Sequence, residues 1–146
     1  MPSARDLLSK KSIKGIISTT PEQSVQEAAK LMLERGVGCL VVTGADSKIV
    51  GLLTEHDVLC RLVAADRDAS DTKVSEIMSR DVAVVEPERS LEEIEAIMRQ
   101  QHVHYLPVAG DEELLGLLST GDVLAYHAAE DKQMVHYLRE YMYGRS

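Results

Sequence analysis

The sequence repeats itself, and this repeat limits the possible folds more than any other feature. The tripeptide at 20–22 (Thr-Pro-Glu) recurs at 86–88 (Glu-Pro-Glu), an offset of 66 residues. Further along, the offset falls to 65 residues and places Gly51 on Gly116. Because a copy of roughly 55 residues cannot bury a generous core alone, we expect the two copies to pack together. The fold is therefore expected to be one unit used twice.

Each copy contains the start of an amphipathic helix. Ser24 with Glu27, and Ser90 with Glu93, have the spacing of a capping box, in which serine and glutamate side chains each accept from the other residue's amide. The spacing predicts a helix beginning at each serine. Apolar residues at i, i+3 and i+7 give each helix one buried face. These are Val25, Ala28 and Met32 in the first copy and Leu91, Ile94 and Met98 in the second.

Short runs of strand type surround each helix, and a second helix follows them. Two of the runs in each copy are joined by a turn that contains Gly and Asp, as is usual between antiparallel strands. Each unit is therefore predicted to be strand, helix, strand, strand and helix. The first strands are expected to open at 14–16 and 80–82, and the later ones to lie at 37–42, 49–53, 103–108 and 114–118.

Charge and hydropathy exclude several classes of protein. The 146 residues include 16 Lys and Arg against 24 Asp and Glu, and the net charge of −8 argues against a nucleic-acid partner. No apolar run approaches the roughly 18 residues of a membrane span, and the charges within residues 1–11 argue against a signal peptide. Cys39 and Cys60 lie in apolar surroundings, which predicts two buried free thiols. We expect a cytoplasmic protein without membrane contact.

The two copies together resemble the tandem cystathionine β-synthase (CBS) domain pair, or Bateman module, over about residues 13–127. The resemblance rests on Gly-Leu-Leu-Ser/Thr-x-x-Asp at 51–57 and 116–122, and on His-x-Leu-Pro-Val at 104–108, in a common register. It implies an α/β (α+β) fold of two β-α-β-β-α repeats, packed through their sheets with pseudo-twofold symmetry. The expected parts are an N-terminal extension 1–12, CBS domains 13–66 and 67–127, and a helical tail 128–146.

The tail has its own apolar pattern. Met134, Tyr137, Leu138 and Tyr141 are spaced as i, i+3, i+4 and i+7, which predicts an amphipathic helix. This helix either packs on its own domain or contacts a partner.

Two equivalent segments, 54–57 and 119–122, carry the chemistry that the resemblance points to. From the residues alone, each is a helix N-cap with an aspartate in the first turn. The resemblance adds that the family uses this aspartate to accept from both ribose hydroxyls of an adenosine ligand. The helix N-terminus would also offer amides to a phosphate. The two roles can coexist.

The pseudo-twofold symmetry implied by the resemblance gives two candidate sites. His104 is expected to turn toward phosphate or to cap the sheet edge, and Tyr105 stands where phosphate-binding relatives can carry a basic residue. His102 and His104 alternate on the expected strand, yet no third ligand joins them, so no metal site is expected. One site would combine Gly15, Ile16, Val37 and Gly38 with His104, Ser119 and Asp122, and the other Val82, Val103 and His104 with Gly38, Thr54 and Asp57.

No arrangement typical of catalysis is visible in the sequence, so we expect no enzyme and no required cofactor. The leading hypothesis is a regulatory sensor that binds AMP, ADP, ATP, NAD(H) or S-adenosylmethionine between the repeats. It would signal by a conformational shift to an enzyme or transporter acting in trans. The alternative is a ligand-independent dimerisation or adaptor protein of the same family. A homodimer is expected, because family pairs associate through their helical faces.

Overall fold

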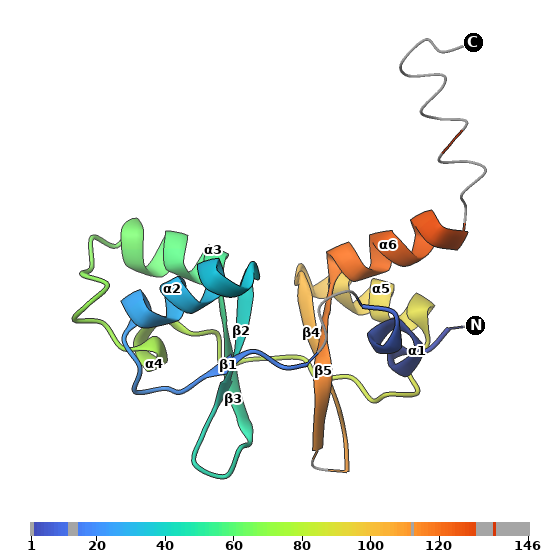
Figure 1. Cartoon of the computed structure of the whole chain (residues 1–146), viewed down its shortest axis with the longest axis horizontal. Helices are drawn as coiled ribbons and strands as arrows, with labels where there is room; N and C mark the ends of the chain where they lie inside the picture. Colours follow the sequence, from blue (N-terminus) through green and yellow to red (C-terminus); the bar gives the residue numbers. More distant parts are fainter. Residues whose placement is uncertain (1, 12–14, 112, 131–135, 137–146) are drawn as a thin grey trace.

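The computed structural model describes residues 2–11, 15–111, 113–130 and 136. Figure 1 shows two similar halves whose sheets face each other at the centre, with the helices outside them. The predicted α+β fold of two repeats is confirmed.

The first half is built around a three-stranded sheet in the order β1-β2-β3. Strand β1 runs parallel to β2, and β2 runs antiparallel to β3. The strands are β1 (Ser18–Thr19), β2 (Cys39–Thr43) and β3 (Ile49–Thr54). The helices are α2 (Val25–Arg35), α3 (Glu55–Asp57) with its π-helical continuation η1 (Val58–Val63), and α4 (Val74–Ile77).

The second half has a two-stranded antiparallel sheet, and its expected first strand does not form. Ser79 pairs instead with Leu52 of the first half, and only Val85 reaches the second sheet, through an isolated parallel bridge to Val108. The first strand of the first half likewise begins later than predicted, at Ser18. The strands are β4 (Tyr105–Gly110) and β5 (Glu113–Ser119), and the helices are α5 (Leu91–Gln101) and α6 (Thr120–Glu130).

Each half is completed by a segment from outside its repeat. The N-terminal helix α1 (Ala4–Ser9) buries Ala4 and Leu7 in the core of the second half. The segment 74–78, which follows the first repeat, buries Val74 and Ile77 in the core of the first half. After each of these elements the chain crosses to the other half, as Figure 1 shows. These crossings bring residues of the connecting segments to the space between the sheets.

The two sheets pack through a small aliphatic cluster. Cys39, Val41 and Leu52 are buried in the first sheet and pack against Tyr105 and Leu117 of the second. This contact lies at the centre of the molecule and agrees with the predicted packing of the two repeats through their sheets.

The helix starts agree with the predicted caps in part. Ser90 and Glu93 form a complete capping box. Ser24 accepts from the Glu27 amide, but its own amide donates to Gln23 Oε1, so this box lacks the returning bond. His102 is the left-handed C-cap of α5 rather than a strand residue, because the helix extends to Gln101. The predicted alternation of His102 and His104 on a strand is therefore wrong.

Helix α6 is described as far as Glu130, and the tail helix predicted from 131–146 lies outside the described residues apart from His136. Among the described segments, no helix has the length and apolar character needed to cross a membrane.

Candidate functional site

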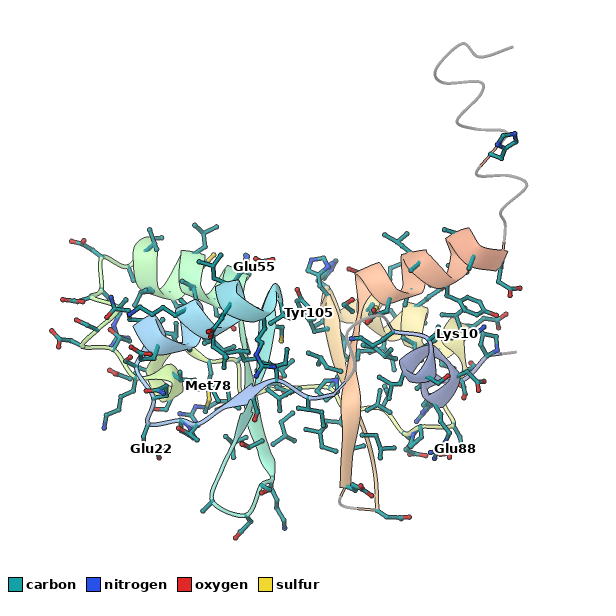
Figure 2. The ribbon with its side chains drawn as sticks, viewed as in Figure 1. Lys10, Glu22, Glu55, Met78, Glu88 and Tyr105 are labelled. Atoms are coloured by element: carbon teal, nitrogen blue, oxygen red, sulfur yellow. The ribbon has the colours of Figure 1, made fainter. Side chains whose placement is uncertain are left out.

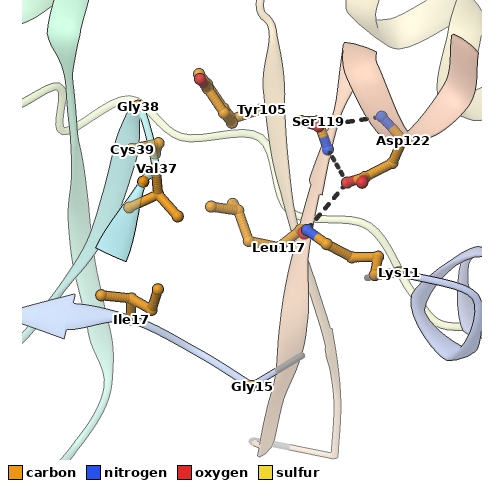
Figure 3. A pocket seen from close by; sticks show the side chains of 11 residues that line it. Lys11, Gly15, Ile17, Val37, Gly38, Cys39, Tyr105, Leu117, Ser119 and Asp122 are labelled. Atoms are coloured by element: carbon orange, nitrogen blue, oxygen red, sulfur yellow. Dashed lines mark hydrogen bonds and ion pairs between the residues drawn. The ribbon is translucent and has the colours of Figure 1, made fainter. Parts of the chain in front are cut away.

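Two pockets lie between the halves, one beside each of the repeat-related aspartates. The Asp57 pocket has a volume of about 510 Å³ and is lined by residues that include Asp57, Ser79, Val82 and His104. The Asp122 pocket has a volume of about 210 Å³, and its walls include Lys11, Gly15, Val37, Leu117 and Asp122. Figure 3 shows the Asp122 pocket from close by.

Asp57 is held at the start of α3 by a complete capping box. The Thr54 hydroxyl accepts from the Asp57 amide at 3.1 Å, and Asp57 Oδ2 accepts from the Thr54 amide at 3.0 Å. The second carboxylate oxygen, Oδ1, accepts from the Ser79 hydroxyl at 3.0 Å. The residue is 4% exposed. A buried carboxylate thus has one oxygen fixed by the helix and the other bound to a neutral hydroxyl.

Asp122 has the same capping geometry at the start of α6 and a different third partner. Its amide donates to the Ser119 hydroxyl at 3.1 Å, and its Oδ2 accepts from the Ser119 amide at 2.8 Å. The ammonium of Lys11 lies 3.0 Å from the same Oδ2 and donates to the Leu117 carbonyl at 2.5 Å. Figure 3 draws the bonds between Ser119 and Asp122 and the ion pair between Asp122 and Lys11. The carboxylate therefore faces a fixed cation.

Cys39 and Tyr105 occupy equivalent positions in the two repeats and form part of the wall between the sheets. Burial, with a smaller contribution from the nearby Asp57 charge, raises the pKa of the Cys39 thiol to about 12. Burial also raises the pKa of Tyr105. Figure 2 shows Tyr105 at the centre of the molecule, where the two halves meet. Both groups are therefore neutral near pH 7, which keeps this wall of the pockets uncharged.

The Asp57 pocket carries imidazoles and carboxylates. His56, His102 and His104 line it together with Glu55, Asp57 and Asp81, and none of its described lining residues is Lys or Arg. Within the described ranges, no cluster of three or more His, Cys, Asp or Glu side chains has the geometry to hold a metal ion.

Comparison with known proteins assigns the family. The family model of the CBS domain matches residues 4–64 and 74–129. The chain belongs to the CBS domain family. Paired CBS domains are regulatory modules that generally bind adenosine-containing ligands, and stand-alone CBS proteins are generally not catalytic.

Three similar proteins illustrate the match. CBS domain-containing protein YhcV of Bacillus subtilis is 34% identical over 108 residues, which are 74% of this chain and 76% of that protein. A solved CBS-domain protein from Burkholderia ambifaria is 34% identical, with a TM-score of 0.83 over 88% of this chain and 96% of its own. A hexameric CBS-CP12 protein from bloom-forming cyanobacteria is 27% identical, with a TM-score of 0.75 over 84% of this chain and 66% of that chain.

The CBS pair brings together most of the predicted site residues. Ile16 does not line the Asp122 pocket, because its successor Ile17 faces the pocket instead. His104 lines the Asp57 pocket and is absent from the described lining of the Asp122 pocket, where Tyr105 is found. The Asp122 pocket contains Gly15, Val37, Gly38, Ser119 and Asp122, and the Asp57 pocket contains Thr54, Asp57, Val82, Val103 and His104. Ligand binding by these residues stays a prediction.

Gly38 lines only one of the two pockets assigned to it. A Cβ atom at this position would lie 2.7 Å from the Tyr105 hydroxyl and 2.7 Å from Glu55 Oε1. Both of these side chains line the Asp57 pocket, whereas Gly38 is absent from its described lining. A side chain at this position would require the ends of both neighbouring side chains to shift.

Sequence reasoning missed Lys11 and Ser79, which contact the two aspartates directly. Both lie in connecting segments outside the repeated core, so the repeat offers no signal for them. The prediction of a buried thiol was right for Cys39 and wrong for Cys60, which is exposed on η1 with its sulfur 3.5 Å from His56 Nε2.

Proposed function

We propose that this CBS pair is a regulatory sensor that binds an adenosine-containing compound in the cleft between its repeats, on the Asp57 side. The observation that carries the proposal is the buried, capped Asp57 carboxylate on the wall of a pocket of about 510 Å³. That volume lies within the range of roughly 300–1,000 Å³ typical of small-molecule sites.

The chemistry of the pocket fits a nucleoside. Asp57 Oδ1 already accepts from a hydroxyl, that of Ser79, so a ribose hydroxyl can replace it with the same hydrogen bond. Leu52, Val82 and Val103 supply apolar surface for an adenine ring. A ligand in this position would touch both halves of the chain.

The charge of the pocket bears on the class of adenosine compound. The lining carries Glu55, Asp57 and Asp81 against three histidines. A cationic compound such as S-adenosylmethionine is therefore favoured over the polyanionic ATP. Tyr105, where a basic residue would help a polyphosphate, adds to this preference.

Regulation requires that the ligand prefer one arrangement of the two halves. A compound bridging the halves shifts the equilibrium only by its difference in affinity between the arrangements. We propose that an enzyme or transporter in the cytoplasm reads this shift in trans.

A homodimer is the proposed form of the sensor. Leu33, Leu59 and Val63 are 85%, 59% and 62% exposed on the helices of the first half, and Leu124 is 68% exposed on α6. Covering these side chains would remove apolar surface from water. The hexameric CBS-CP12 protein is a related assembly that supports association. Light scattering should give twice the chain mass, and a monomer would contradict the proposal.

The ligand proposal is tested by thermal unfolding with adenosine, AMP, ATP, NAD and S-adenosylmethionine. A compound at 100 times its Kd should stabilise the fold by about 2.7 kcal/mol. Guanosine serves as the matched control, because it has the same ribose and a different base. The absence of a shift with every adenosine compound would refute ligand sensing and favour a ligand-independent adaptor.

A further inference from the structure

We propose that Lys11 determines which half of the cleft takes the adenosine compound. The Lys11 ammonium fills the ribose-binding position beside Asp122, so that one compound binds per chain, beside Asp57. This inference rests on the proposed function and adds to it the stoichiometry and the residue that sets it.

Lys11 pairs its charge with that of Asp122 and also donates a hydrogen bond to the backbone. Its Nζ lies 3.0 Å from Asp122 Oδ2 and 2.5 Å from the Leu117 carbonyl oxygen. The two charged side chains are 19% and 20% exposed, so the pair is largely withdrawn from water. Displacing a lysine from a partly desolvated carboxylate leaves a charge without its partner, which is costly. A neutral ribose hydroxyl gives back a hydrogen bond but no charge.

The equivalent position in the other half carries no charge. Leu52 and Leu117 correspond in the two repeats, and each is met by the segment through which the chain leaves that half for the other. Ser79 exchanges two backbone hydrogen bonds of 2.9 Å with Leu52, and its hydroxyl donates to Asp57. Lys11 reaches Leu117 with its side chain instead. The same architecture thus delivers a hydroxyl to one aspartate and an ammonium to the other.

The pocket volumes agree with this assignment. The Asp122 pocket, at about 210 Å³, is below the roughly 300 Å³ at which small-molecule sites begin, and the Asp57 pocket is above it. Lys11 is itself part of the wall of the smaller pocket. Removing its side chain would enlarge this pocket and expose the Asp122 carboxylate to a ribose.

Isothermal titration calorimetry tests the proposal, with AMP, ATP, NAD and S-adenosylmethionine as the probes. The wild-type chain should bind one equivalent of whichever probes it binds. Lys11→Met should bind two equivalents of the same probe. Lys11→Gln, which keeps a donor for the Leu117 carbonyl without the charge, should also gain a second, weaker equivalent. Lys10→Met is the matched control, because the Lys10 ammonium lies over the Tyr126 ring at 5.0 Å, and it should stay at one.

The outcomes separate the inference from the function on which it rests. Binding of none of the probes by the wild-type chain would refute the proposed function. Two equivalents in the wild-type chain would overturn the role of Lys11 and leave ligand sensing intact. The same holds if folded Lys11→Met or Lys11→Gln protein, checked by circular dichroism, remains at one equivalent. Because the wild-type stoichiometry alone can overturn the inference, the test does not depend on the stability of the variants.

Discussion

Asp57 and Asp122 occupy the same position in the two repeats, and the partners that reach them from outside the repeats differ. Both carboxylates are fixed by a capping box at a helix N-terminus. Asp57 then meets the hydroxyl of Ser79, and Asp122 meets the ammonium of Lys11. The comparison teaches that a repeated sequence can specify two similar frames whose chemistry is decided by segments outside the repeats.

The connecting segments differ because each performs a second task. The segment before the first repeat follows α1, and Ala4 and Leu7 of this helix belong to the core of the second half. The segment before the second repeat follows α4, which belongs to the core of the first half. Each segment leaves one core and passes the sheet of the same half on its way to the other, and this route carries its polar side chain to the aspartate of the half that it leaves.

Exchanging each aspartate for asparagine gives the largest expected difference between the halves. Asp57→Asn should weaken binding of the adenosine compound by about 10- to 100-fold, since hydrogen bonds to a charged group contribute roughly 1.5–3 kcal/mol. Asp122→Asn should weaken binding far less if Lys11 already occupies its carboxylate. Calorimetric titration of both variants with AMP and S-adenosylmethionine measures the difference.

Melting temperatures of the two asparagine variants provide the control, because both lose the same capping carboxylate. Equal loss of affinity in the two variants would show that the halves bind alike and would remove the distinction between them.

The repeat made the frame of this site predictable from the sequence. The capped aspartates, the helix starts and the antiparallel hairpins depend on local chemistry that recurs at a fixed offset, and these features were predicted correctly. Lys11 and Ser79 were not predicted, because their contacts are made across more than 20 residues of chain and have no counterpart in the offset. The first strand at 80–82 failed for the same reason, since Ser79 pairs with the opposite half.

Two equivalent glycines show how differently the halves accept the crossing segments. A Cβ on Gly51 would lie 2.6 Å from the backbone oxygen of Ser79, which is held by its bridge to Leu52. A Cβ on Gly116 would lie 2.7 Å from Leu8 Cδ2, the movable end of a side chain. Gly51→Ala should therefore lower the free energy of unfolding by about 1–3 kcal/mol, the usual cost of overpacking, and Gly116→Ala by less than about 1 kcal/mol.

Urea denaturation of both glycine variants gives this comparison directly. A larger loss for Gly116→Ala would mean that α1 packs more rigidly on β5 than the segment at Ser79 packs on β3.

The equivalent central residues Cys39 and Tyr105 should make the free energy of unfolding depend on pH, and this effect should be smaller than that of Gly51→Ala. The folded state raises the pKa of Cys39 from an ordinary value of 9.0 to about 12. Between these values only the unfolded chain loses the thiol proton, so the contribution to stability is complete below pH 9 and is lost as the pH rises toward 12. The free energy of unfolding should fall by about 1 kcal/mol from this residue between pH 8 and pH 10.

Urea denaturation at the two pH values measures how steeply the free energy of unfolding falls with pH. The fall should be smaller in Cys39→Ala. Tyr105→Phe is the matched control. It should change the pH dependence less, because an ordinary tyrosine loses its proton only near pH 10, at the upper end of this range. A wild-type slope that survives unchanged in Cys39→Ala would assign the alkaline loss to other groups.

Substitutions at the starts of α2 and α5 should give the smallest difference in stability between the repeats. Ser90 donates from both its amide and its hydroxyl to Glu93 Oε1, whereas the Ser24 amide donates to Gln23 and leaves Glu27 without a returning bond. Glu93→Ala should therefore lower the free energy of unfolding by about 0.5 kcal/mol, and Glu27→Ala by only a few tenths. Parallel urea melts at low salt would resolve this gap. Equal losses would mean that the returning bond contributes nothing, and that both helices rely on the serine hydroxyl alone.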